Sequence, residues 1–213
     1  MQKSYNANSA DKIVYAATDF YNELRIDDFG RFRSWEHNYK VFHDARSESQ
    51  HDYSFLSLHL SFYLASWGMY RGSSFLLQKD YRIHIPVIKE VLNKKYDVLL
   101  GIECSQYKKE NNLNLLFELA EFIAKYYEGI RREAKEEIIA NDVSETLVTK
   151  ILMGVLGCCP AYDSYFRSGL SIEKVGTQRF NKKSILELVN FYEDNSEKLE
   201  DARKNMEVEQ YGK

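Results

Sequence analysis

Apolar residues recur along this chain at the spacing of three to four residues that one face of an α-helix requires. The first such run covers residues 11–25, and the turn residues at 27–30 end it. A second run covers 35–42 and stops at the polar segment 47–50. These two runs predict a pair of helices near the start of the chain.

The segment 55–67 carries apolar side chains on two opposite faces, which predicts a helix buried on most of its sides. Gly68 and Gly72 then predict a bend that makes the residues between them accessible. Pro86 predicts the start of another helix, which continues through Leu92. The second apolar face of the 55–67 helix consists of Phe55, Leu58, Phe62 and Ala65.

Three more helices are expected further along the chain. An acidic helix runs from 113 past 127 with a break near Gly129, and two others cover 184–192 and 196–206. Residues 97–101 are compatible with a short strand, but no neighbouring segment alternates strongly enough to pair with it. An all-α architecture is therefore predicted.

The helix with the clearest start signal lies before Pro160. Asp142 and Glu145 have the spacing of a capping box, and the apolar stripe that follows predicts one buried face. The opposite face carries Gly154 and Gly157 and is expected to be bare, so that another helix or a DNA strand can approach its backbone. The proline is expected to end the helix.

Composition adds that one compact unit is expected. Hydrophobic residues make up 44% of the chain, and no linker, repeat or low-complexity segment divides it. We therefore expect residues 1–213 to form a single α-helical domain, either one globule or two lobes with a cleft. The net charge is −3, but residues 163–183 hold five basic and two acidic side chains, so the remainder of the chain is at −6.

The cysteines and the N-terminal residues bear on the compartment. Cys104, Cys158 and Cys159 cannot all pair, and the adjacent two are awkward to bridge, so disulfides are not expected. The first residues lack the apolar core of a secretion signal, and no run approaches the length of a membrane span. A cytoplasmic protein without a membrane partner is expected.

The candidate chemistry lies at Asp163, which stands between Tyr162 and Tyr165 at the start of a helix. A carboxylate beside aromatic rings can stabilise a cationic transition state next to a stacked base or sugar, and it can orient a water. An Asp in the first turn of a helix is also explained by its favourable charge at the positive end of the helix dipole. Both interpretations stay open at this point.

A resemblance to a known family is carried by residues 142–166, in which a helix leads through Pro160-Ala161-Tyr162 to Asp163. This segment resembles the core of the helix-hairpin-helix DNA glycosylases. The resemblance implies that Asp163 stabilises the oxocarbenium-like sugar and that Lys150, on the preceding helix, is a Schiff-base candidate. The alternative for Lys150 is a solvated helix charge or a phosphate contact. The glycine-rich hairpin with which that family grips a phosphate is absent, because Ala-Asn-Asp-Val stands at 140–143.

Aromatic and basic side chains near the bend and near the aspartate are candidates for holding DNA. Rings can stack on an extruded base, a guanidinium can read its polar edge, and a basic run can contact phosphates. The alternative for Trp67 is a place in the core. The predicted base-binding residues are Trp67, Tyr70, Arg71, Tyr162 and Tyr165, and the predicted phosphate-binding residues are Lys174, Arg179, Lys182 and Lys183.

No metal or cofactor is expected, because the five histidines show no ligand pairing and no glycine-rich phosphate loop or dinucleotide fingerprint is present.

The leading hypothesis is a DNA glycosylase-like enzyme that flips a damaged or modified base and cleaves its glycosidic bond. Defence against viral DNA with bulky cytosine modifications is one role within it. The alternative is a non-enzymatic α-helical interaction protein with a partner-binding patch at Tyr162, Tyr165 and Phe166.

Overall fold

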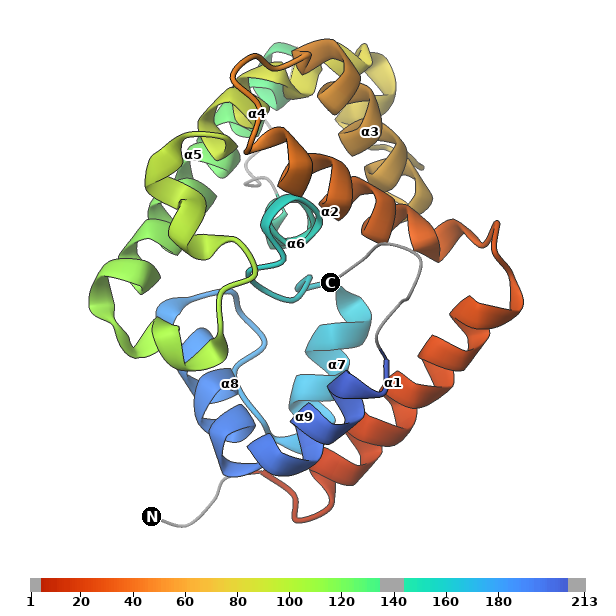
Figure 1. Cartoon of the computed structure of the whole chain (residues 1–213). Coiled ribbons are helices and arrows are strands. Elements are labelled where there is room, and N and C mark those ends of the chain that lie inside the picture. The colour runs from red at the N-terminus through yellow and green to blue at the C-terminus, as the bar shows by residue number, and fades with distance from the viewer. Residues whose placement is uncertain (1–4, 135–143, 207–213) are drawn as a thin grey trace.

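The regular structure is helical throughout the part of the chain that the structure describes, as the apolar spacing predicts. The computed structural model describes residues 5–134 and 144–206, and it has no strand within them. The helices pack as one compact body (Figure 1). They are α1 (Ser9–Ile26), α2 (Ser34–Ala45), α3 (Tyr53–Ser66), α4 (Ile85–Val91), α5 (Glu110–Ala134), α6 (Glu145–Leu156), α7 (Ser164–Glu173), α8 (Lys182–Asp194) and α9 (Ser196–Lys204). The 3₁₀ turns between them are η1 (Arg31–Arg33), η2 (Phe75–Gln78), η3 (Tyr81–His84), η4 (Lys94–Leu99) and η5 (Cys104–Lys108).

Helix α6 lies at the centre of the molecule and is seen end-on in Figure 1. It contacts α2, α3 and α5, and nine of its twelve residues are buried. The expectation of a bare glycine face is therefore wrong. A Cβ atom added at Gly154 would lie 2.4 Å from Cε1 of Tyr63, so this glycine allows α3 to approach α6 closely.

The ends of α6 differ from the predicted ones. Ser144 is the N-cap, and its hydroxyl accepts a hydrogen bond from the Leu147 amide at 3.3 Å. Asp142, the predicted capping residue, lies outside the described residues. At the other end Gly157 has φ +61° and its amide donates to the Met153 carbonyl, so a left-handed glycine ends the helix three residues before Pro160.

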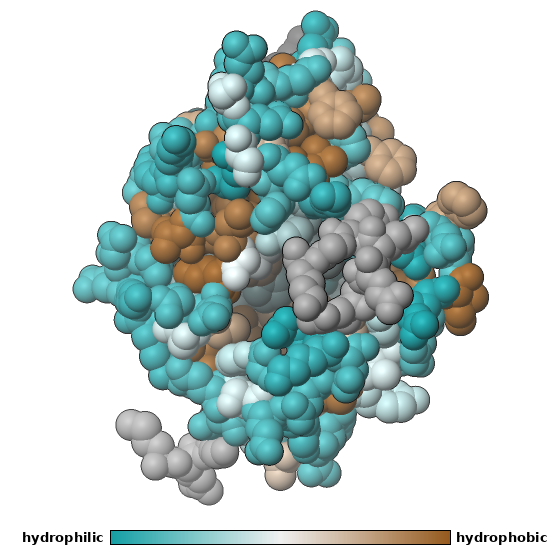
Figure 2. Space-filling model, in the orientation of Figure 1, coloured by the Kyte–Doolittle hydropathy of each residue, from teal (hydrophilic) through white to brown (hydrophobic). Residues whose placement is uncertain are grey.

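Helix α3 buries only one of its two apolar faces. Leu60 and Leu64 are fully buried, whereas Phe55, Leu58 and Phe62 are 49%, 54% and 65% exposed. The prediction of a helix buried on most sides is therefore wrong for this face. Figure 2 shows hydrophobic side chains gathered on the surface where α3 lies.

Helix α5 runs without interruption through Gly129, so the predicted break is absent. A glycine inside a helix costs only about 1 kcal/mol, and burial of Ile123 and Tyr127 in the turns before it outweighs that cost. The segment for which a short strand was considered falls largely within η4, as the all-α architecture requires. Directly after it, the Gly101 amide donates to the Leu156 carbonyl at 2.7 Å, which ties this segment to the end of α6.

Candidate functional site

A hollow of about 560 Å³ lies where η1, the bend after α3, α6 and the start of α7 meet. Its volume is within the range of small-molecule sites, about 300–1,000 Å³. It brings together five of the residues that the sequence singles out, although they lie up to 98 positions apart. These five are Trp67, Arg71, Lys150, Asp163 and Tyr165, and the other lining residues are Arg31, Phe32, Ser66, Gly68, Met69, Thr146 and Ser164.

Asp163 is the N-cap of α7 and is held in one orientation. Its Oδ1 accepts hydrogen bonds from the amides of Tyr165 at 3.1 Å and Phe166 at 3.0 Å. The other oxygen, Oδ2, lies 3.8 Å from Nζ of Lys150, and the side chain is 25% exposed. One oxygen therefore caps the helix, which confirms the interpretation of Asp163 as a helix-start charge, and the carboxylate also lines the hollow and is accessible from it.

Lys150 is largely buried, with 7% of its side chain exposed, so a solvated helix charge is excluded. Its Nζ donates to the Trp67 carbonyl at 2.7 Å and lies 5.8 Å from the centre of the Trp67 ring. Burial lowers the pKa of Lys150, Asp163 opposes this by raising it, and Arg71 lowers it further. The net lowering increases the fraction of neutral amine at a given pH.

Buried and half-buried side chains fix the helix that carries Lys150. The Tyr63 hydroxyl donates to the Lys150 carbonyl at 2.9 Å, and Asn38 Nδ2 donates to the Gly154 carbonyl at 2.6 Å. The indole of Trp35 donates to the Met153 carbonyl at 3.2 Å. Three contacts from α2 and α3 thus set the position of α6 relative to the wall of the hollow.

Aromatic rings form one wall of the hollow. The rings of Phe32 and Trp67 meet edge to face with centroids 5.4 Å apart, and Phe20 of α1 packs on Phe32 at 5.6 Å. The guanidinium of Arg31 lies 4.6 Å from the Phe32 ring centre. Sequence reasoning missed Arg31 and Phe32, because no local pattern links η1 to an aspartate more than 130 positions later.

Two of the predicted base-binding tyrosines lie behind the site instead of in its wall. Tyr162 is fully buried, and its hydroxyl shares a 2.7 Å hydrogen bond with Oγ of Ser184. The backbone of Asp163 is extended, so neighbouring side chains point in opposite directions, and Tyr162 enters the core while Asp163 faces out. Tyr70 hydrogen-bonds Nε2 of His84 at 2.7 Å and does not line the hollow.

Of the four predicted phosphate-binding residues, only Arg179 lines a hollow near the aspartate. It helps to form a second hollow of about 450 Å³, which shares Thr146 with the first. Arg167 lines the same hollow and pairs with Glu145 at 2.9 Å. Two arginines and one glutamate leave this second hollow with a positive balance.

The three predicted lysines line neither of these hollows. Lys174 is the C-cap of α7 with φ +56°, Lys182 donates to Oδ1 of Asn114 at 2.5 Å, and Lys183 lies 3.8 Å from Glu187. The predicted basic run therefore does not converge on the hollow beside Asp163.

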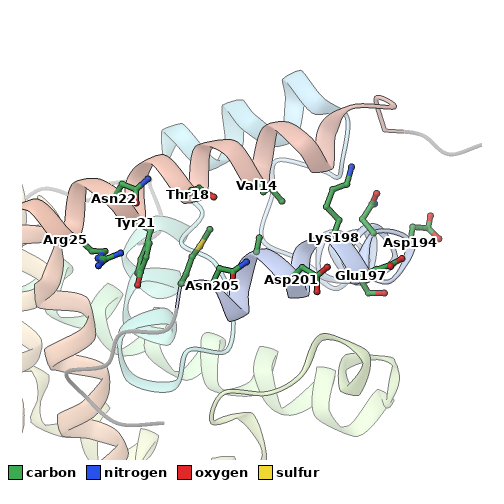
Figure 3. Close-up of a pocket in the computed structure, with 14 residues that line it drawn as sticks. Val14, Thr18, Tyr21, Asn22, Arg25, Asp194, Glu197, Lys198, Asp201 and Asn205 are labelled. Carbon is green, nitrogen blue, oxygen red and sulfur yellow. The ribbon is translucent and has the colours of Figure 1, made fainter.

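A larger hollow, about 870 Å³, lies between α1 and α9 (Figure 3). Its lining includes Asp194, Glu197 and Asp201 against Arg25 and Lys198, and none of the predicted site residues. Acidic side chains outnumber basic ones there, which disfavours a polyanion. The hollow beside Asp163 has three basic side chains and one acidic one, so it is the better candidate for nucleic acid.

Within residues 5–134 and 144–206, no three His, Cys, Asp or Glu side chains are grouped as metal ligands would be. No helix in those ranges has both the length and the apolar character needed to cross a bilayer.

Comparison of the chain with protein-family models, with curated proteins and with solved structures finds no match in any of the three. The interpretation of the site therefore depends on its own geometry.

Proposed function

We propose that this protein is a DNA glycosylase-like enzyme that excises a damaged or modified base at Asp163. The observation that carries the proposal is the hollow in which Asp163 and Lys150 lie 3.8 Å apart against an aromatic wall. A base extruded from the DNA duplex needs aromatic rings on which to stack, and its sugar needs a carboxylate beside C1′. Trp67 and Phe32 are suited to the first role and Asp163 to the second.

The proposed reaction is the hydrolysis of an N-glycosidic bond. The C1′–N bond breaks and its electron pair leaves with the base, which takes a proton from solvent. The carboxylate of Asp163 stabilises the positive charge that develops on the sugar. A water adds its oxygen to C1′ and gives a proton to the same carboxylate, which returns it to solvent. The products are the free base and an abasic site.

Lys150 supports a second route, in which its amine takes the place of the water. The nitrogen bonds to C1′ as the C1′–N bond breaks and the base leaves with its electron pair. The C1′–O4′ bond then opens to give an imine, and the two amine protons pass to O4′ and to solvent. Loss of a C2′ proton to solvent expels the 3′ phosphate and cuts the strand, and water hydrolyses the imine to free Lys150. This route needs a neutral amine, and burial lowers the pKa of Lys150 in that direction. Trapping of the imine by borohydride is its signature.

The charge around the site supports a polyanionic ligand. Arg31 and Arg71 line the hollow beside Asp163. Arg167 and Arg179 line the second hollow, which shares Thr146 with the first. We propose that the phosphates next to the extruded nucleotide bind along these arginines, which gives an affinity that falls as salt rises.

The order of elements around Asp163 also supports the proposed likeness to the helix-hairpin-helix DNA glycosylases. Asp163 follows α6 after a short turn and begins α7, which is the arrangement that the resemblance implies. Residues 140–143, where that family has its phosphate-gripping hairpin, lie outside the described residues. A pocket of about 560 Å³ has room for a base with a bulky substituent, which agrees with a role against modified viral DNA.

The test is abasic-site formation by wild type and Asp163→Asn on DNA with damaged and hypermodified bases. Asparagine caps a helix as well as aspartate does, so this variant keeps the fold and loses only the charge. Asp52→Asn is the matched control, because Asp52 caps α3 through the Phe55 amide at 2.9 Å and does not line the hollow. We expect base release by wild type and Asp52→Asn and its loss in Asp163→Asn. Equal rates in all three would exclude Asp163 from the chemistry.

A second candidate function is a non-enzymatic interaction protein, and the exposed face of α3 favours it. Phe55, Leu58 and Phe62 form an apolar stripe of the kind that marks protein contacts. The patch expected at Tyr162, Tyr165 and Phe166 does not form, because Tyr162 is buried. Association with a protein that survives high salt, without DNA binding, would favour this function over base excision.

A further inference from the structure

A chain of hydrogen bonds in the core leads to the bend that forms one wall of the hollow. His84 is fully buried between two tyrosines. Its Nδ1 makes a short hydrogen bond with the Tyr127 hydroxyl, and its Nε2 makes one of 2.7 Å with the Tyr70 hydroxyl. Tyr70 in turn reaches Oγ of Ser61 at 3.5 Å, and Ser61 donates to the Ser57 carbonyl at 2.8 Å in α3.

These bonds are consistent with one direction of donation. Burial lowers the pKa of His84 to about 3, so the ring is neutral at neutral pH and has one donor nitrogen and one acceptor nitrogen. Tyr70 donates to Ser61, which requires Nε2 of His84 to donate to Tyr70 and Nδ1 to accept from Tyr127. A single tautomer of His84 then satisfies both of its ring nitrogens and the hydroxyls of Tyr127, Tyr70 and Ser61.

Tyr70 is the member of the bend that points away from the hollow. Its neighbours Gly68, Met69 and Arg71 line the hollow, and Trp67 lines it at the start of the bend. Gly68 has φ +77° and Gly72 has φ +58°, so left-handed backbone marks each end of the bend. Lys150 holds the Trp67 carbonyl from the hollow side, whereas Tyr70 is held from the core side.

We propose that His84 is a positioning residue that acts through Tyr70 to hold Trp67 and Arg71 in the wall of the hollow. His84 lies outside the hollow and does not touch a ligand there. The backbone of the bend is tied to α3 by the amides of Gly68 and Met69, which donate to the carbonyls of Ala65 and Leu64. The hydrogen bond of Tyr70 to His84 fixes the side of the bend that faces the core, so its loss lets Trp67 and Arg71 shift in the wall of the hollow. The hydrogen bond from Tyr127 joins His84 to α5 and makes no contact with the bend.

The two tyrosines on either side of His84 give a matched pair of variants. Tyr70→Phe and Tyr127→Phe each remove one hydroxyl and one hydrogen bond from the same imidazole. Trp35 and Trp67 are the two tryptophans of the chain, so a Trp35→Phe background leaves Trp67 as the single tryptophan. This background also lacks the indole bond to the Met153 carbonyl, so Trp35→Phe alone is the reference for both tyrosine variants. Emission maximum and acrylamide quenching then report the exposure of Trp67 directly.

In that background we expect Tyr70→Phe to shift Trp67 emission to the red and to raise its quenching constant, while Tyr127→Phe leaves both unchanged. Denaturant unfolding of both variants checks that each is folded. Equal fluorescence changes in the two variants, or none in either, would overturn the positioning role. His84→Gln is expected to follow Tyr70→Phe, but the conclusion depends on the tyrosine pair should that variant fail to fold.

A second measurement rests on the proposed function. With base release as the assay, Tyr70→Phe should lose about tenfold or more in rate, as a misplaced binding group does, and Tyr127→Phe should retain the wild-type rate. If wild type releases no base, the proposed function fails and the fluorescence result still decides the positioning role. If base release is normal in Tyr70→Phe and its fluorescence is unchanged, the positioning role fails alone.

Discussion

Gly154→Ala is expected to destabilise the protein, against the usual effect of this substitution in a helix. The added methyl would lie 2.4 Å from Cε1 and 2.8 Å from Cζ of Tyr63, closer than real contacts allow. Tyr63 is fully buried, and its hydroxyl is bound to the Lys150 carbonyl, so the ring has no free space into which it can turn.

The magnitude follows from three opposing contributions. Replacing glycine by alanine inside a helix gains about 1 kcal/mol. Overpacking of a dense core costs about 1–3 kcal/mol, and a lost hydrogen bond from Tyr63 leaves a buried carbonyl with one partner fewer, at about 1 kcal/mol more. The net effect on Gly154→Ala is a loss of about 1–3 kcal/mol, which lowers Tm by about 2–4 °C per kcal/mol in a chain of this size.

Gly129→Ala is the matched control, since Gly129 lies within α5 and a Cβ there meets no atom within 4 Å. It is expected to stabilise the protein by up to about 1 kcal/mol. Urea unfolding of wild type and both variants measures the change in free energy of unfolding, which is read from the urea concentration at the midpoint when the m-value is unchanged. A Gly154→Ala variant as stable as Gly129→Ala would refute the close packing of α3 on α6, and with it the proposed support of Lys150.

Two other predictions concern the core and the surface. His84 is neutral in the folded protein down to pH about 3, but it titrates near 6.5 when unfolded, so the unfolded chain binds the extra proton as the pH falls. The contribution of His84 to stability is therefore fully present above pH 6.5 and is lost progressively as the pH falls from 6.5 toward 3. In urea unfolding, wild type should lose about 2 kcal/mol more than His84→Gln between pH 7 and pH 5; parallel losses would contradict the neutral ring. On α3, Phe62→Ser should change stability by about 0.5 kcal/mol or less and Leu60→Ala should cost about 2–5 kcal/mol, and similar costs would show that the Phe62 face is covered.

The helices were predictable because their signals are local. Apolar spacing predicts α1 and α2 within a few residues of their observed ends, and the turn at 27–30 separates α1 from η1 as expected. The same periodicity cannot say whether an apolar face meets a partner, which is why the outer face of α3 was expected to be buried. The break predicted near Gly129 was wrong for a related reason, because the packing of the turns before it decides whether α5 continues.

The site was predictable in part, and the rest depended on tertiary contacts. Asp163 was identified by its own neighbours, because a cap and a short turn are local features. Arg31 and Phe32 carry no local signal, and only the packing of α2 against α6 brings η1 beside the aspartate. Tyr162 was misassigned because adjacency in sequence does not mean a shared direction where the backbone is extended.

Base excision at Asp163 is tested most directly by the single-turnover rate of base release from one DNA substrate. Wild type and Asp163→Asn are compared at saturating enzyme, with DNA binding measured in parallel. We predict that the variant binds the DNA as wild type does but releases the base at least about 100-fold more slowly, the scale of a lost transition-state contact. Equal rates of release, or no release by wild type from any modified DNA, would contradict the proposal.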